Sequence, residues 1–175
     1  MRLTPEHLQV YLYTSREGNL KAIGHDLKLS VERFWVDIES KEIEAGFEAS
    51  SIRVLGNMVG DTLKQNVSQS DKKKIKKSLE SQVLKASKFP MVRFKGTICW
   101  DDLVVGGTLT LCGVERDVQL NLRMEDDMMV GSSIVNQTDF GIKQFSALLG
   151  QLKVHPEVRV ELIFDSSLLD SLGDV

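Results

Sequence analysis

Two runs of alternating apolar and polar residues between positions 103 and 124 constrain the fold most. The apolar positions of the first run are Leu103, Val105, Leu109 and Leu111. Those of the second run are Val118, Leu120, Leu122 and Met124. Because successive side chains of a strand point to opposite faces, each run predicts a strand with one apolar face. The short connection at residues 112–117 contains Gly113, so the two strands are predicted to form an antiparallel hairpin.

The same alternation predicts further strands at residues 7–14, 27–38, 42–49, 50–55, 91–100, 128–138 and 154–164. Within 27–38 the apolar positions change from odd to even near Glu32 and Arg33, which predicts a β-bulge that bends the strand. A hairpin is expected at Ser40 and Lys41. Residues 56–67 contain two glycines and no period, so they are predicted to form a loop.

One substantial helix is predicted over residues 71–86. Ile75, Leu79 and Val83 recur every four residues, Ser70 is the expected N-cap, and Pro90 disfavours helix at the residue before it. Short helical turns are expected at 20–24 and at 140–150, the second with Gly150 as its C-cap. Residues 166–175 are expected to be a frayed tail.

About eight long antiparallel strands and one external helix fit either a closed barrel or a sandwich. The barrel is favoured, because the strands are long, the bulge allows bending, and closure removes exposed sheet edges. The fold class expected is therefore all-β with one or two short helices, an eight-stranded antiparallel barrel. Its length of 175 residues fits a single domain over residues 1–175.

Composition argues against several functions. A net charge of −3 gives no support for nucleic-acid binding. The lysine run at 72–77 is interpreted as a solvated helix face, with an anionic surface contact as the alternative. No secretory signal and no run of about 18 apolar residues occurs, so we expect a cytoplasmic protein without integral membrane contact. Cys99 and Cys112 do not have the spacing of a zinc site, and free thiols are expected, with a disulfide as the alternative if their strands are neighbours.

The residue types that support catalysis are scarce. His7, His25 and His155 are not at metal-binding spacing, and no nucleophile or phosphate-loop motif occurs. His25 is interpreted as a hydrogen-bonded structural residue, with contact to a ligand head group as the alternative. Asp139 is interpreted as a turn or cap residue and His155 as a strand-edge residue. Gly106 and Gly107 suggest either sheet curvature or close approach of a ligand.

The interior of such a barrel is either filled by side chains or holds one apolar ligand. Burial contributes about 0.8 kcal/mol per CH₂, so an acyl or isoprenoid tail can bind without specific polar contacts. The candidate ligand contacts are the residues expected to point inward, with His25 as a head-group partner. These inward residues are Leu29, Phe34, Val36, Phe47, Phe94, Leu109, Leu111, Leu120 and Phe164.

Four motifs, in this order along the chain, resemble the YceI-like family. They are residues 24–27 (GHDL), 88–94 (KFPMVRF), 107–114 (GTLTLCGV) and 139–141 (DFG), and the resemblance extends over residues 7–165. It implies a lipocalin-like antiparallel barrel that binds polyisoprenoid chains, such as that of a ubiquinone, along its lumen. Many members are periplasmic, and dimers are common. We expect no signal peptide from the residues given, and the lysine-rich segment 71–86 stands in place of the family's usual Arg-Asp-x-His-Leu segment.

Three functional hypotheses follow, in this order. The first is a non-enzymatic module that binds, stores or carries a long apolar ligand, with an isoprenoid quinone as a candidate and a homodimer as one assembly. The second is a structural or interaction protein with a filled barrel. The third is an enzyme acting on a hydrophobic substrate with His25 as general base. The family has no agreed catalytic residues, and no metal or bound cofactor is expected.

Overall fold

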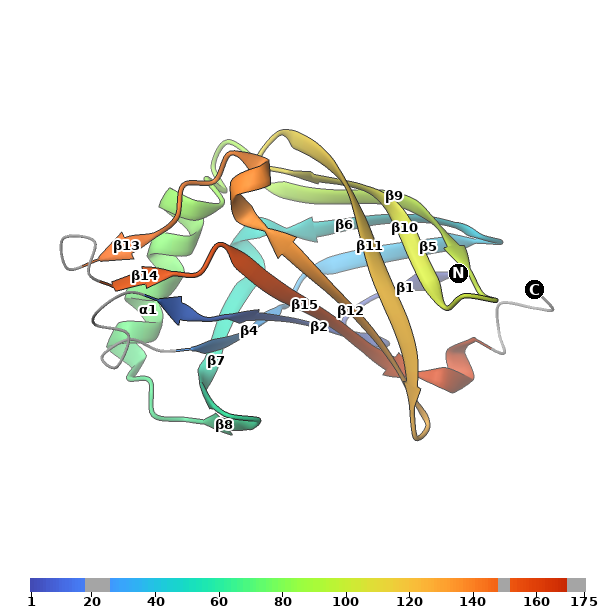
Figure 1. Ribbon diagram of the computed structural model, residues 1–175, viewed down its shortest axis with the longest axis horizontal. Coiled ribbons are helices and arrows are strands. Elements are labelled where there is room, and N and C mark those ends of the chain that lie inside the picture. The colour runs from blue at the N-terminus through green and yellow to red at the C-terminus, as the bar shows by residue number, and fades with distance from the viewer. Residues whose placement is uncertain (18–25, 148–151, 170–175) are drawn as a thin grey trace.

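The computed structural model describes residues 1–17, 26–147 and 152–169, and most of them belong to one antiparallel sheet. The sheet contains twelve strands in the order β1-β5-β6-β9-β10-β11-β12-β15-β2-β4-β7-β8 (Figure 1). The strands are β1 (Arg2–Leu3), β2 (Leu8–Thr14), β4 (Leu27–Val31), β5 (Phe34–Glu39), β6 (Glu42–Glu48), β7 (Ile52–Val59), β8 (Thr62–Lys64), β9 (Met91–Cys99), β10 (Val104–Leu111), β11 (Val114–Glu125), β12 (Met128–Asn136) and β15 (Glu157–Asp165).

The sheet is curled because two of its runs bend. Only two residues separate β4 from β5, and the 3₁₀ turn η1 (Ala49–Ser51) separates β6 from β7. In one bent run, β4 pairs with β2 and β7, while β5 pairs with β1 and β6. Strands β5 and β6 lie near one end of the strand order, and β4 and β7 lie near the other end. Because β4 continues into β5 and β6 into β7, the sheet curls around on itself (Figure 1).

The predicted change of parity near Glu32 and Arg33 is confirmed, since Val31 before it and Phe34 after it are both buried. Glu32 and Arg33 separate β4 from β5, so the chain forms two strands here and not one strand with a β-bulge. The predicted count of eight strands is not confirmed, because the sheet contains twelve. The bends divide long runs into separate strands, and two short strands, β1 and β8, were not predicted.

The prediction of a loop at 56–67 is wrong. Strand β7 continues to Val59 and turns through Gly60 into β8. Lys28 pairs with Gly56 and Leu29 with Val54, so Leu55 is an extra residue that breaks the period of two. Gly56 is required by a close approach, because a Cβ there would lie 2.4 Å from the carbonyl oxygen of Lys64.

One predicted hairpin turn has the expected length, and a second is shorter than expected. The turn at Ser40 and Lys41 is confirmed, with Glu39 paired to Glu42. In the hairpin of β10 and β11, Leu111 pairs with Val114, so the turn is only Cys112 and Gly113 and not the whole of 112–117. Both turn residues have positive φ, 51° and 77°, as a type I′ turn requires.

The helical segment consists of α1 (Gln69–Ser78) followed by one turn of π-helix, η2 (Leu79–Val83). The predicted cap, Ser70, is wrong. Ser68 caps the helix: its Oγ accepts from the Asp71 backbone N–H at 3.1 Å and donates to Asp71 Oδ2 at 2.8 Å. The lysine run is not simply a solvated face, because Lys76 donates to the carbonyl oxygens of Ser50 and Ile52 at 2.8 and 3.0 Å.

The C-terminal segments also differ from the prediction. In place of a helical turn over 140–150, the 3₁₀ helix η3 (Gln137–Phe140) ends at Gly141, whose φ is 69°, and an extended segment follows. Gly150 and residues 20–24 lie outside the described residues. The first part of the predicted frayed tail is ordered as η5 (Ser166–Leu168), which is N-capped by Asp165.

A second, three-stranded sheet lies at the α1 end of the molecule (Figure 1). Its strands, in the order β13-β14-β3, are β13 (Ser146–Ala147), β14 (Leu152–Val154) and β3 (Arg16–Glu17).

Candidate functional site

The concave side of the curled sheet encloses a cavity of about 290 Å³. Its described lining residues come from all the long strands and are apolar almost throughout. The polar exceptions are Thr14, Glu48, Ser133 and Gln137. Such a wall offers little hydrogen bonding, so a molecule held there is held mainly by burial of its own apolar surface.

Eight of the ten candidate contact residues line this cavity: Leu29, Val36, Phe47, Phe94, Leu109, Leu111, Leu120 and Phe164. Phe34 does not line it. It is buried, and its ring packs against that of Phe47 at a centroid distance of 5.7 Å. This position follows directly after the bend at Glu32 and Arg33, where the alternation restarts. His25 lies outside the described residues.

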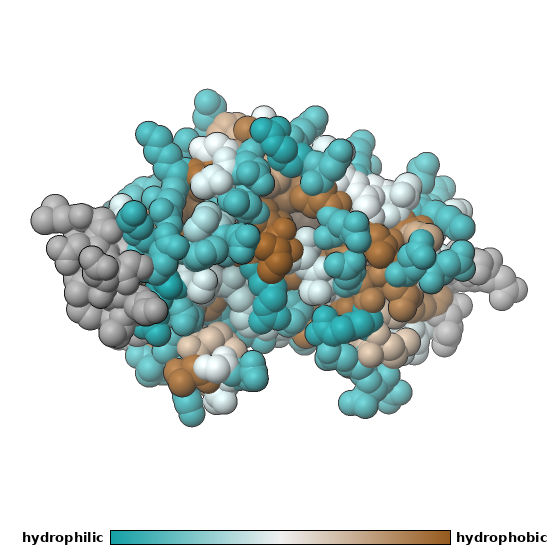
Figure 2. Space-filling model, in the orientation of Figure 1, coloured by the Kyte–Doolittle hydropathy of each residue, from teal (hydrophilic) through white to brown (hydrophobic). Residues whose placement is uncertain are grey.

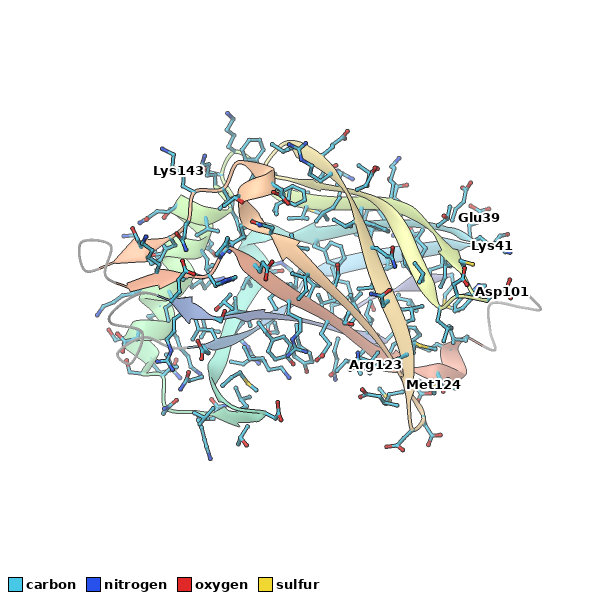
Figure 3. The ribbon with its side chains drawn as sticks, in the orientation of Figure 1. Glu39, Lys41, Asp101, Arg123, Met124 and Lys143 are labelled. Atoms are coloured by element: carbon cyan, nitrogen blue, oxygen red, sulfur yellow. The ribbon has the colours of Figure 1, made fainter. Side chains whose placement is uncertain are left out.

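Met124 also departs from its predicted inward position and is 53% exposed. It lies near the end of β11, where Figure 3 shows it beside Arg123. Pairing of β10 with β11 stops at Val104 and Asn121, and the last backbone hydrogen bond on that side joins Leu122 to Leu103, so Met124 lies beyond the end of β10. The alternation therefore continues to the end of β11, but the buried interior of the sheet ends before Met124.

Several lining residues were not among the candidates. Leu79, Val83 and Leu84 come from the helical segment, while Ile142 and Leu169 come from segments without a period of two. The apolar spacing of the helix was a usable signal, because a helix with one apolar stripe must bury it. No local pattern could have indicated Ile142 or Leu169, because their position at the cavity depends on how the segments after β12 and after β15 fold back over the sheet.

Phe94 lies against two glycines inside the cavity. Gly96 of β9 and Gly107 of β10 are directly paired. A Cβ on Gly107 would lie 2.3 Å from the carbonyl oxygen of Lys95 and 2.7 Å from the Phe94 ring. The aromatic ring thus covers the space that the missing side chains leave. Gly106 differs, because a Cβ there would meet nothing within 4 Å.

The end of the cavity away from α1 carries an unsatisfied donor. Trp100 lines the cavity, and its Nε1 is buried with no hydrogen-bond partner among the described residues. The N–H of a buried indole ordinarily finds an acceptor, so an oxygen atom supplied by a ligand would remove an energetic cost. Figure 3 shows Glu39, Lys41 and Asp101 at this end of the sheet and Lys143 at the α1 end.

Glu48 is the one acidic residue among the described residues of the lining. The Arg33 guanidinium forms a bidentate pair with its carboxylate, with Nη2 donating to Oε1 at 2.7 Å, and the Ser50 hydroxyl donates at 2.9 Å. These hydrogen bonds lower the pKa of Glu48 to about 2. Glu48 therefore stays ionised at neutral pH, and its charge is already paired with Arg33.

We expect the Arg33–Glu48 pair to make stability depend on acid pH. The unfolded carboxyl has a pKa of about 4.3, and the folded one has a lower pKa of about 2. The stabilisation is thus fully present above the unfolded pKa and is lost as pH falls through the folded pKa. Urea unfolding should show wild type more stable than Glu48→Gln at pH 6, with the difference shrinking below pH 4. A difference that does not change between pH 6 and pH 2 would contradict this assignment.

The described part of the chain contains no group of three or more His, Cys, Asp or Glu side chains that could hold a metal ion. Both cysteines are free, and burial raises the pKa of the Cys112 thiol. Asp139 is exposed in the first turn of η3, where Asn136 and not Asp139 is the cap. Among the described residues, no helix is long and apolar enough to cross a membrane.

Two of the sequence motifs meet in space near the α1 end of β10. The turn residue Gly113 belongs to the 107–114 motif, and a Cβ on it would lie 2.8 Å from the ring of Phe89 in the 88–94 motif. Phe140 of the 139–141 motif is 3% exposed and belongs to the same buried cluster as Leu111. The motifs therefore act together in packing one end of the barrel wall.

The model of the YceI-like domain matches residues 2–165. The chain belongs to the YceI-like family. No curated protein was found to match the sequence. Solved structures with similar folds include BcnA of Burkholderia cenocepacia, at 11% identity and a TM-score of 0.55 over 89% of this chain and 95% of that one. A polyisoprenoid binding domain from Saccharophagus degradans, implicated in plant cell wall breakdown, is 13% identical with a TM-score of 0.56 over 90% and 93%.

The match confirms the resemblance seen in the sequence. At these identities the two solved structures show the fold of this YceI-like protein, a curled antiparallel sheet, and no more than the fold. The cavity is the feature of that fold on which a functional argument can be built.

Proposed function

We propose that this YceI-like protein binds a long-chain apolar molecule, such as a polyisoprenoid or its quinone, in the cavity of the curled sheet. The observation that carries the proposal is the cavity of about 290 Å³ with almost entirely apolar walls. Membership of the YceI-like family supports it, as does the similarity in fold to a polyisoprenoid binding domain. An open interior argues against the hypothesis of a filled barrel.

Burial supplies the affinity in this proposal. Ten methylene equivalents removed from water contribute about 8 kcal/mol, and only the surplus over the cost of association appears as affinity. The apolar walls select a ligand by the length and width of its chain more than by its functional groups. The eight cavity-lining candidates contact the chain.

A short-chain ubiquinone provides a direct test, because the cavity contains its own reporter. Trp100 lines the cavity, whereas Trp35 packs against Gly46 and lies 5.3 Å from the Arg2 guanidinium carbon, measured to the ring centroid. In a Trp35→Phe background, we expect saturable quenching of Trp100 fluorescence by the quinone. Organic extraction of the purified protein and mass spectrometry should also recover a bound lipid. No quenching together with no recovered lipid would refute the proposal.

A further inference from the structure

Strands β11 and β12 are paired over only part of their length. Their pairing runs from Glu125 and Met128 to Asn121 and Ser132, and then stops. Beyond it, residues 114–120 pair only with β10 and residues 133–136 only with β15, among the pairings of the described chain. The two strands diverge toward η3 (Figure 1). The wall of the cavity is therefore split at this place.

A groove of about 470 Å³ lies at the split and shares part of its wall with the cavity. Val118, Ser133 and Val135 line both spaces. The Ser133 hydroxyl donates to the backbone oxygen of Gln119 at 2.7 Å, so one side chain bridges strands whose backbones are unpaired. Ile134, which does not line the cavity, lines the groove and is 57% exposed. Figure 2 shows hydrophobic surface framed by hydrophilic surface on this face of the molecule.

We propose that this groove between β11 and β12 is the side entrance of the cavity and seats the uncharged polar end of a single-chain lipid whose tail lies inside. This inference rests on the proposed function. Pockets that enclose drug-sized ligands measure about 300–1,000 Å³, and the cavity, at about 290 Å³, is at the lower limit of that range. A long chain must therefore extend beyond the cavity, and the groove, which lies across the shared residues Val118, Ser133 and Val135, is the neighbouring space that can receive it.

The charges of the groove favour an uncharged group. Its lining contains two arginines, Arg116 and Arg159, and two aspartates, Asp117 and Asp139, so the formal charges balance. Arg159 is already engaged: its Nη1 donates to Glu161 at 2.7 Å, and its guanidinium stacks on Tyr13 at 3.8 Å from the ring centroid. An anionic head group would meet balanced charge, whereas a hydroxyl or carbonyl can hydrogen-bond to the remaining amide and hydroxyl side chains. These are Gln119, Asn121, Ser132, Ser133 and Asn136.

Cross-linking the two strands tests the entrance. Continuing the register from Asn121 and Ser132 places Gln119 opposite Ile134. In a Cys99→Ser/Cys112→Ser background, the variant Gln119→Cys/Ile134→Cys is closed with a short bis-maleimide. The matched control is Glu125→Cys/Met128→Cys, at exposed positions already paired in the same two strands. Stopped-flow quenching of Trp100 by a short-chain ubiquinone then measures the rate of uptake.

We expect the cross-link at 119 and 134 to slow uptake at least tenfold relative to the uncross-linked variant, and the control cross-link to leave the rate unchanged. Equal rates before and after cross-linking at 119 and 134, in a protein that does bind the quinone, would overturn the entrance alone. Absence of quinone binding in the uncross-linked protein would instead overturn the proposed function.

The nature of the polar end is tested with two probes that share one tail. Geranylgeraniol and geranylgeranyl diphosphate compete with the quinone in the uncross-linked protein. We expect the alcohol to bind at least tenfold more tightly than the diphosphate. Tighter binding of the diphosphate would overturn the assignment of an uncharged group to the groove.

Discussion

Replacing Ala45 with phenylalanine is expected to abolish lipid binding while leaving the protein folded. Ala45 is 2% exposed, lines the cavity, and pairs with the lining residues Val36 and Phe94. The added ring would occupy open space that a ligand tail needs. Displacing about four methylene groups, at about 0.8 kcal/mol each, removes about 3 kcal/mol, or more than a hundredfold in affinity. Titration with a short-chain quinone, followed by Trp100 fluorescence, measures this loss.

Glu44→Phe is the matched control, because Glu44 is the exposed preceding residue of the same strand and points away from the cavity. It should leave affinity unchanged. Thermal unfolding distinguishes an open interior from a filled one, since inserting a ring into a filled core costs about 1–3 kcal/mol. Wild-type affinity in Ala45→Phe would contradict the site. A strongly destabilised Ala45→Phe, together with a similarly destabilised Leu120→Phe at a second lining position, would show that the interior is filled.

The largest effect on stability is expected from Gly107→Ala. The new Cβ would lie 2.3 Å from the Lys95 carbonyl oxygen and 2.5 Å from the Gly96 Cα, both backbone atoms that cannot move aside without separating β9 from β10. Overpacking of this kind costs about 3 kcal/mol, which lowers Tm by about 6–12 °C for a domain of this size. Phe94 must also leave its place on the glycine pair, so quinone affinity should change with stability.

Gly106→Ala, at the neighbouring residue, provides the control. A Cβ at Gly106 meets nothing within 4 Å, and alanine loses less conformational freedom than glycine on folding, so stability should stay within about 0.5 kcal/mol or rise. Chemical denaturation of the two variants side by side measures the contrast. Equal destabilisation of the two variants would contradict the close approach of β9 as the cause of the cost.

Alternation in the sequence was sufficient to predict the walls. Leu109, Leu111, Leu120 and Phe164 were chosen by their period of two alone, and all line the cavity. This works because the pleat of a strand assigns faces locally, whatever its neighbours are. It fails where local geometry is interrupted. The extra residue Leu55 concealed the end of β7. Phe34 does face inward as predicted, but whether an inward residue reaches the cavity depends on its neighbours, and Phe34 packs against Phe47 instead.

The amino-acid sequence by itself determined an antiparallel β fold with one apolar face, the bend that allows it to curl, and the motifs of the YceI-like family. The tertiary structure alone decided that the interior is open, that Phe94 rests on Gly96 and Gly107, and that β11 and β12 part to form a groove. The physical reason is that side-chain direction follows from the local backbone. Empty volume and unpaired strand edges depend instead on the distance between strands, which long-range pairing sets.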